Sequence, residues 1–388
     1  MRDARRDAHH RRRQQPAQPD GCQFLHAAGR HRTCDPCRRR ARHAQSEVRE
    51  VIIAEATSAP AVRASGLAQI IREPILWLVL SILVLGALTS PHYLSALNIQ
   101  NLLRNAALVG LLATGMTIVL ITGRIDLSVA ANMVFSVIVA VVVTSWVGRE
   151  LGLRWIVKGN TFAGSPLIFV AVSLLTGTAI GALNGVGVAY FKVASFIMTL
   201  VSLTALRGLS YLATNGAPFY LKGAFFNWLS DELWLGVPVS FVLLVVLVLF
   251  AHAFLSRTVA GNRLFAIGGN ETATLYSGIT TNRYIVASFA LSGLFAAVAG
   301  LVFTARLKSV EAALAQGYEL TAIAIAVLGG VALAGGTGSL WRVLTAAVGF
   351  SAGLNLLAIW GVPTWYQNLA IGAVLILAVS LTRLNHKN

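Results

Sequence analysis

The chain has 388 residues, of which 56% are hydrophobic and only 12% are charged, with a mean hydropathy of +0.70. A soluble domain cannot bury so large an apolar fraction, so the composition excludes an ordinary water-soluble protein and indicates a polytopic membrane protein. The formal net charge of +16 does not require nucleic acid, because 13 basic residues lie in residues 1–50 and most others lie in short gaps between apolar runs, as the positive-inside rule predicts.

Residues 1–60 form an Arg-rich N-terminal extension that we expect to be disordered. All three cysteines, Cys22, Cys34 and Cys37, lie here with histidines nearby, which raises the alternative of a small zinc site. A complete zinc site needs four well-spaced ligands and apolar residues packed around them, and the segment lacks these, so we predict no metal site. It also lacks the uninterrupted apolar run of a secretory signal.

The composition changes abruptly near Glu50, and no methionine occurs between Met1 and Met116. Our hypothesis is that part of the extension is a misassigned start, with translation beginning near Val48 or Val51 on an alternative codon. Peptides from residues 1–45 in a mass spectrum of the mature protein would refute it.

Apolar runs separated by polar gaps continue from residue 74 to the C-terminus. A bilayer core about 30 Å thick needs about 20 apolar residues per helix. We therefore predict an all-α fold with about ten transmembrane helices in one domain, residues 70–388. The eighth and ninth spans are the weakest, because glycine clusters interrupt their helical pattern. The predicted spans are 74–90, 102–122, 126–147, 166–190, 195–213, 237–255, 284–304, 318–334, 340–359 and 365–381.

The charge distribution favours an orientation with both termini in the cytoplasm of a bacterium. Ten spans return the C-terminus to the side of the basic N-terminal extension, and the polar segment 256–279 then lies inside with its arginines. The outside loop 148–165 is a mild exception, since it carries three basic residues against one acid. We expect a multi-pass protein of the cytoplasmic (inner) membrane.

Three polar side chains within or beside predicted spans are candidates for a translocation path or a gate. Asp126 follows Arg124 in the polar break 122–128 and can start the third span, because an acid is favoured at a helix N-terminus. Asn184 lies in a span rich in small residues, which we expect to be central to the bundle, and serves either a helix–helix hydrogen bond or the path. Arg207 lies mid-span and needs a partner or water.

The segment between the sixth and seventh spans is polar but patterned. Asn270 can cap a short helix that begins at Glu271, and Gly278 can end it. Such a helix at the membrane surface needs something to pack on. It docks on a cytoplasmic partner or forms part of a solvated loop.

This segment, SRTVAGNRLFAIGGNETATLYSGI, resembles the cytoplasmic coupling segment of ABC-importer permeases of the ribose/xylose/branched-chain amino-acid family, with its typical pattern TxxGRxxxAIGGNxxAAxxSGI. Three further stretches agree in the same order. They are 115–129, Asn184-Gly185 with 195–200, and 318–324 with 328–330. The resemblance runs from about residue 73 to the C-terminus. At three positions the chain departs from the family pattern, with Arg124 for a second glycine, Thr321 for an aspartate and Arg342 for a small residue.

The resemblance implies one half of a membrane pore for a small hydrophilic solute, a monosaccharide before others. It implies cytoplasmic ABC ATPase subunits that bind ATP and Mg²⁺, a periplasmic or lipid-anchored solute-binding protein, a second permease subunit as homo- or heterodimer, and membrane lipid. The chain itself contains no GxxxxGK[ST] phosphate loop, so we expect neither a cofactor nor a catalytic site in it. The ATPase-coupling residues that the resemblance implies are Arg263, Gly268, Gly269, Asn270, Glu271 and Gly278.

Two other classes of membrane protein share this apolar composition. A secondary, ion-coupled transporter places titratable groups at mid-membrane, and acids are absent from most of the predicted spans. A membrane enzyme needs clustered acid, base or nucleophile, whereas His92 and His252 stand apart without neighbouring acids. Both are less favoured than a permease, and the secondary transporter is the closer alternative.

Overall fold

The computed structural model describes residues 73–151, 156–157, 160–162, 164–369 and 371–373. These residues belong to one compact unit, Gly66–Asn388. The N-terminal extension with its three cysteines lies outside the described residues, and so does the second half of the predicted span 365–381.

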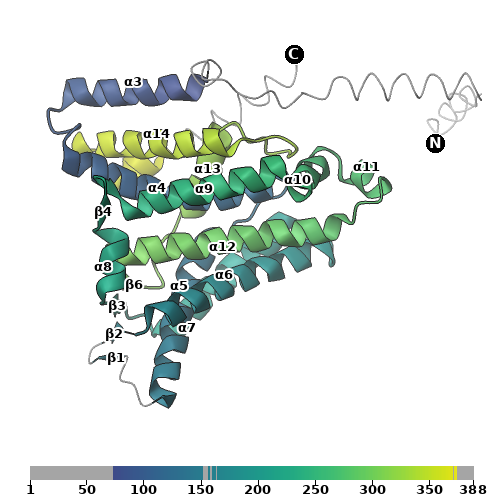
Figure 1. Ribbon diagram of the computed structural model, residues 1–388, viewed down its shortest axis with the longest axis horizontal. Coiled ribbons are helices and arrows are strands. Elements are labelled where there is room, and N and C mark those ends of the chain that lie inside the picture. Colours follow the sequence, from purple (N-terminus) through teal and green to yellow (C-terminus); the bar gives the residue numbers. More distant parts are fainter. Residues whose placement is uncertain (1–72, 152–155, 158–159, 163, 370, 374–388) are drawn as a thin grey trace, which may run out of the picture. The chain divides into compact units, whose positions relative to one another are not determined.

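Apolar helices dominate the unit, which confirms an all-α polytopic membrane protein (Figure 1). Seven described helices are long and apolar enough to cross a membrane. These are α4 (Ala96–Ile121), α5 (Val129–Glu150), α6 (Pro166–Ala189), α7 (Ser195–Thr214), α9 (Val239–Arg257), α12 (Thr281–Leu307) and α14 (Leu340–Ile359). Two shorter apolar helices are α3 (Pro74–Thr89) and α13 (Tyr318–Leu328).

Helix α13 shows why the predicted span 318–334 is too long. It has 11 residues, or about 16 Å, and stops before Gly329 and Gly330. Gly330, Gly335 and Gly336 adopt positive φ, which turns the chain away from a helix and into the connection to α14. Since residues from Thr321 to Val327 are all buried, this short helix ends inside protein rather than in lipid.

Helix α4 lies at the centre of the unit, and α12, α13, α14 and α9 pack against it. Every residue from Ala106 to Ile121 is buried. A helix that is apolar on all sides is buried in a protein core or in a membrane, and α4 is buried by its neighbouring helices. The sequence led us to expect α6 to be central as well, and this is only half right. Its glycine face packs on α12 and α5, while Leu167, Leu175 and Leu183 on its other side are exposed.

The contact between α6 and α12 brings backbone against backbone. A Cβ atom built at Gly181 would lie 2.2 Å from the carbonyl oxygen of Phe289, and one at Gly293 would lie 2.1 Å from that of Gly177. No side chain fits at these distances. The small residues of α6 therefore act as expected of helices in lipid, by allowing close approach.

Among the described residues, six strands of two or three residues lie in the connections at one end of the bundle (Figure 1). The all-α prediction did not include them. A four-stranded sheet has the order β1-β2-β3-β6, in which β2 and β3 are parallel and the other pairs antiparallel. A separate antiparallel pair joins β4 to β5. The strands are β1 (Ile156–Val157), β2 (Thr161–Phe162), β3 (Phe219–Leu221), β4 (Leu233–Trp234), β5 (Val237–Pro238) and β6 (Ser309–Val310).

A short helix, α8 (Ala224–Ser230), is fastened at this same end by Lys308, which follows α12. The Lys308 ammonium lies 2.7 Å from Asn227 Oδ1, 2.8 Å from Ser230 Oγ and 3.0 Å from Asp231 Oδ2. A hydrogen bond from the Ser230 hydroxyl, aided by Lys308, lowers the pKa of Asp231. The carboxylate therefore stays charged and holds the loop against α12.

Two short helices, α10 (Val259–Gly269) and α11 (Glu271–Tyr276), lie at the opposite end of the bundle (Figure 1). The sequence predicted α11 but no helix over residues 259–269. Thr258 caps α10 by accepting a hydrogen bond from the Gly261 amide at 3.1 Å. The segment that connects α9 to α12 is thus a pair of helices.

Candidate functional site

Polar groups gather at the two ends of the central helix α4. Asn101 and Asn105 lie in its first half, which begins at Ala96, and Ile121 is its last residue. Ile121 lies sixteen positions after Asn105, which is about 24 Å along a helix. We call these the Asn105 end and the Ile121 end.

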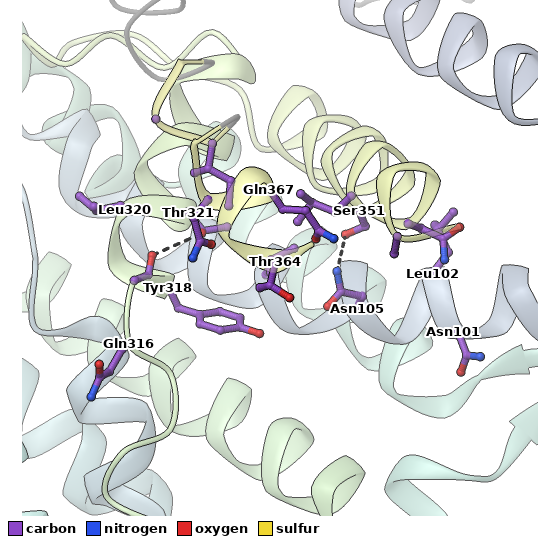
Figure 2. A pocket seen from close by; sticks show the side chains of 18 of the residues that line it. Asn101, Leu102, Asn105, Gln316, Tyr318, Leu320, Thr321, Ser351, Thr364 and Gln367 are labelled. Carbon is purple, nitrogen blue, oxygen red and sulfur yellow. Dashed lines mark hydrogen bonds between the residues drawn. The ribbon is translucent and has the colours of Figure 1, made fainter. Parts of the chain in front are cut away.

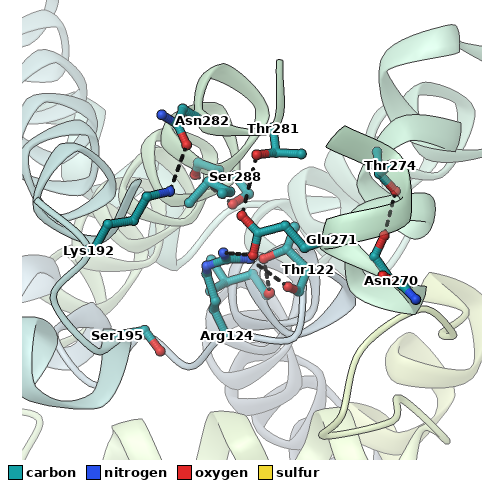
Figure 3. Close-up of polar contacts among 12 residues, drawn as sticks. Thr122, Arg124, Lys192, Ser195, Asn270, Glu271, Thr274, Thr281, Asn282 and Ser288 are labelled. Atoms are coloured by element: carbon teal, nitrogen blue, oxygen red, sulfur yellow. Dashed lines mark hydrogen bonds and ion pairs between the residues drawn. The ribbon is translucent and has the colours of Figure 1, made fainter. Parts of the chain in front are cut away.

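At the Ile121 end, the polar break 122–128 is a turn between α4 and α5. Gly123 adopts a φ of 73°, which a side chain would disfavour. Arg124 reaches from this turn to α11, where its Nη2 lies 2.8 Å from Glu271 Oε2 (Figure 3). Its Nη1 donates to the carbonyl oxygen of Thr122 at 2.8 Å, and its side chain is only 14% exposed. Arg124 therefore pairs with Glu271 rather than with Asp126.

Glu271 joins two elements at once, because its other oxygen, Oε1, accepts a hydrogen bond from Thr281 at the start of α12 at 3.3 Å. The helix that carries it is capped as predicted. Asn270 Oδ1 accepts from the Ala273 amide at 2.9 Å. After α11, the amides of Gly278 and Ile279 bond back into its last turn, with Gly278 at a φ of 81°. The caps fix the carboxylate of Glu271 in place.

The glycines of α10 differ in what they contact. A Cβ on Gly268 would lie 1.8 Å from the carbonyl oxygen of Ile121, and that oxygen accepts a hydrogen bond from the Gly336 amide at 2.9 Å. Gly268 is thus required where α10, α4 and the loop before α14 meet. A Cβ on Gly269 would have no neighbour within 4 Å. Arg263 lies away from this junction and contacts Tyr284 instead.

Asp126 is buried and does not cap α5, which begins at Val129. Its Oδ1 accepts hydrogen bonds from the amide and the hydroxyl of Ser128, at 3.0 and 2.6 Å. Its Oδ2 accepts one from Ser292 of α12 at 2.9 Å. Hydroxyl donors, rather than a cation, satisfy this carboxylate and tie the turn to α12.

Asn184 extends this network into α6 and α7. Its Nδ2 donates to Ser128 Oγ at 2.9 Å, and its Oδ1 accepts from the hydroxyl of Ser202. Both ends of the amide are therefore used between helices. This supports the first of its two predicted roles, the helix–helix hydrogen bond.

We expect Asp126→Ala to destabilise the protein strongly, because it leaves three buried donors without their acceptor at about 1–3 kcal/mol each. Asp126→Asn keeps an oxygen and the side-chain shape, and Ser292 can rotate its hydroxyl to accept, so its effect is expected to be smaller. The apparent melting temperature in detergent measures both. Equal melting temperatures for Asp126→Ala and the wild type would contradict the network.

Arg207 of α7 lies 3.2 Å from Glu319 Oε1 of α13. The side chains are 29% and 12% exposed, so the pair is largely shielded. The second oxygen of Glu319 is buried and accepts no hydrogen bond from the residues that the structure describes. The structure thus brings Arg207 to α13 and not to Asp126 or Asn184.

At the Asn105 end, a cavity of about 700 Å³ lies among α4, α13, α14 and residues 364–372 (Figure 2). Amide and hydroxyl groups dominate its polar lining, and the lining contains no acidic residue. The amides both donate and accept hydrogen bonds. The polar lining residues are Asn101, Asn105, Arg306, Gln316, Tyr318, Thr321, Ser351, Asn355, Thr364, Gln367 and Asn368.

Hydrogen bonds within the lining are few, although Asn355 exchanges two hydrogen bonds of 2.9 Å with Asn98 and Gln367 donates to the carbonyl oxygen of Val362 at 2.9 Å. Asn105 donates to Ser351 Oγ at 3.5 Å, a long contact, and Thr321 donates to the carbonyl oxygen of Gly317 at 3.3 Å. Thr321 stands where the resemblance led us to expect an aspartate, so the cavity carries no carboxylate there. The volume and the neutral donors and acceptors suit a small solute rich in hydroxyl groups.

Sequence reasoning missed this cavity. The signal it could have used is the pair Asn101 and Asn105, four residues apart and so on one face of α4. The facing residues Ser351 and Asn355 repeat the spacing on α14.

A bundle of apolar helices with a polar cavity at one end and two capped surface helices at the other is a multi-pass membrane protein built for transport. The chain belongs to the family described as "Branched-chain amino acid transport system / permease component", whose model matches residues 98–379. Four matching motifs in the sequence had indicated the same family.

Curated relatives agree. The chain is 38% identical over 310 residues to the ribose import permease protein RbsC of Escherichia coli K12. The aligned residues are 77% of this chain and 91% of the relative. It is 37% identical over 318 residues to RbsC of Bacillus subtilis 168, with 80% and 92% covered. It is 34% identical over 352 residues to the xylose transport system permease protein XylH of E. coli K12, with 75% and 86% covered. No solved structure matches the chain.

Proposed function

We propose that the chain is the transmembrane permease subunit of an ATP-driven ABC importer and that it carries a monosaccharide. The observation that supports the sugar most directly is the cavity at the Asn105 end, whose amides and hydroxyls match the hydroxyl groups of a sugar. Relatives named for ribose and xylose import agree with it. A branched-chain amino acid, which the family description names, would leave its ammonium without an acidic partner in this lining, and only its carboxylate would have an oppositely charged group, Arg306.

The Ile121 end is, in this proposal, the cytoplasmic end that meets the ATPase subunits. Helix α11 presents Leu275 and Tyr276, its last two residues, which are 55% and 86% exposed. Exposed apolar side chains next to one another suit a partner surface. Helix α11 would act as the coupling helix, and a push on it would reach α4, α5 and α12 through Glu271 and Arg124.

The remaining parts of the importer follow from the same proposal. Partner ATPase subunits bind ATP and Mg²⁺, a periplasmic or lipid-anchored protein delivers the sugar to the Asn105 end, and a second permease subunit completes the pore. The fold then has about ten spans in the bacterial inner membrane, with α3, α13 and the helix from residue 364 added to the seven long helices, and both termini in the cytoplasm.

The test is uptake into proteoliposomes that contain the permease, its ATPase subunit and its solute-binding protein. We expect ATP-dependent uptake of a radiolabelled sugar that the binding protein retains from a panel of pentoses and hexoses. Uptake of leucine with no sugar taken up would overturn the monosaccharide. Uptake driven by an ion gradient without ATP would overturn the ABC mechanism.

Two substitutions probe the cavity itself. We expect Asn105→Leu and Thr321→Val to reduce sugar uptake about 5-fold each, the loss of one net hydrogen bond of about 1 kcal/mol. Gln100→Leu is the matched control, because Gln100 lies on α4 beside the cavity but is not part of its lining. Uptake by both variants at the level of the Gln100→Leu control would contradict a role of the cavity in transport.

A further inference from the structure

A second cavity, of about 490 Å³, lies between α10 and α12 near the Ile121 end. Its mouth holds Arg263 of α10, with Arg283 and Tyr284 of the first turn of α12. Below the mouth the walls are apolar. The cavity is thus charged at one end and apolar along its length.

The apolar wall follows one face of α12. Tyr284, Ala287 and Leu291 are three and four residues apart, so their side chains stack along the helix over about 10 Å. Phe254, from the last turn of α9, and Leu264 of α10 form the facing wall. Because α9 and α12 are membrane-spanning helices, this groove leads from the surface into the depth that acyl chains occupy.

The two arginines at the mouth carry charge that the protein does not neutralise. Neither Arg263 nor Arg283 forms an ion pair among the residues that the structure describes. The nearest acid along the chain, Glu271, is engaged by Arg124. Arg263 donates one hydrogen bond to the Tyr284 hydroxyl and lies over that ring, 5.4 Å from its centre. A guanidinium has five N–H donors, so most of those on Arg263 stay available.

We propose that this groove binds an anionic phospholipid, with the headgroup phosphate between Arg263 and Arg283 and one acyl chain along Tyr284, Ala287 and Leu291. The guanidinium of one arginine can donate two parallel hydrogen bonds to the oxygens of a phosphate. Basic pockets between membrane helices near the cytoplasmic surface select anionic lipids by this charge. A protein partner would match the arginines as well, but it would not reach the apolar wall along a spanning helix.

The proposal takes the Ile121 end as the cytoplasmic side, as proposed above, and does not depend on which solute is carried. It gives Arg263 a role different from the ATPase contact that the sequence suggested. The bound lipid would hold α10 against α12 beside the Arg124–Glu271 pair.

Native mass spectrometry of the purified permease, titrated with phosphatidylglycerol or phosphatidylcholine of identical acyl chains, tests the proposal. We expect phosphatidylglycerol to be retained at least 10-fold more tightly than phosphatidylcholine. The double variant Arg263→Gln with Arg283→Gln should lose this preference. Arg257→Gln is the matched control, because Arg257 is an exposed arginine of the same surface that does not line the groove.

A second variant separates the lipid from a free phosphate. Leu291→Trp fills the apolar groove and leaves both arginines in place, so it should weaken phosphatidylglycerol binding at least 10-fold, and millimolar inorganic phosphate should not displace the lipid from the wild type. Equal retention of the two lipids by the wild type would overturn the proposal. So would displacement by phosphate together with normal lipid binding by Leu291→Trp, which would indicate a phosphate site. If the double variant does not fold, Leu291→Trp decides alone.

Discussion

Replacing Gly293 of α12 with alanine is expected to lower the apparent melting temperature of the detergent-solubilised protein sharply and to leave little monodisperse material. The new Cβ would lie 2.1 Å from the carbonyl oxygen of Gly177, and the helix backbones fix the positions of both atoms. No side-chain rotation relieves such an overlap, so α6 and α12 must separate. Overpacked cores commonly lose about 1–3 kcal/mol, and here we expect the upper part of that range or more.

The matched control is Gly208→Ala in α7, because a Cβ at Gly208 has no neighbour within 4 Å. That change should leave the protein unaffected or slightly stabilise it, since alanine favours a helix over glycine. Gly181→Ala should behave like Gly293→Ala, because its Cβ would lie 2.2 Å from the carbonyl oxygen of Phe289. Wild-type melting of both α6 and α12 variants would show that the helices do not touch through these glycines.

Reversing one charge of the Arg124–Glu271 pair is expected to uncouple ATP hydrolysis from transport while the bundle stays folded. Glu271→Lys places two cations about 3 Å apart at a shielded site, where the original pair is only partly exposed. In the reconstituted importer we expect stimulation of ATPase activity by loaded solute-binding protein to fall at least 10-fold. Normal stimulation would count decisively against the coupling role.

The double variant Arg124→Glu with Glu271→Arg restores opposite charges at the same two positions. If the pair transmits force, this swap should recover most of the stimulation that either single reversal loses. Arg342→Glu provides the comparison, since it breaks the 2.6 Å pair with Glu73, where the arginine is 48% exposed. We expect that exposed pair to contribute little. Equal losses for Arg342→Glu and Arg124→Glu would indicate a general effect of charge.

Local chemistry made part of this molecule predictable. The cap at Asn270, the stop at Gly278 and the spans that became α4 to α7, α9, α12 and α14 each depend on residues close together in the sequence. The break at residues 122–128 was also placed correctly. The ion pair that this break forms with α11 was not predicted. Arg124 and Glu271 are 147 positions apart, and neither local sequence pattern indicates the other.

The features that the sequence did not predict also depend on contacts between residues far apart in the chain. The helix α13 is short because Gly329 and Gly330 meet α14 and the chain turns, which hydropathy does not register. The two- and three-residue strands are formed by pairing between connections far apart in the chain, for example β3 with β6. The cavity at the Asn105 end needs α4 and α14 side by side before its amides face one another.

The glycine junction at the Ile121 end has a mechanical consequence. Where Gly268, Ile121 and Gly336 meet, main chain touches main chain, and there is no side-chain torsion that can absorb a displacement. These backbone atoms cannot move closer together. A shift of α10 toward this contact must therefore move α4 or the loop that leads into α14.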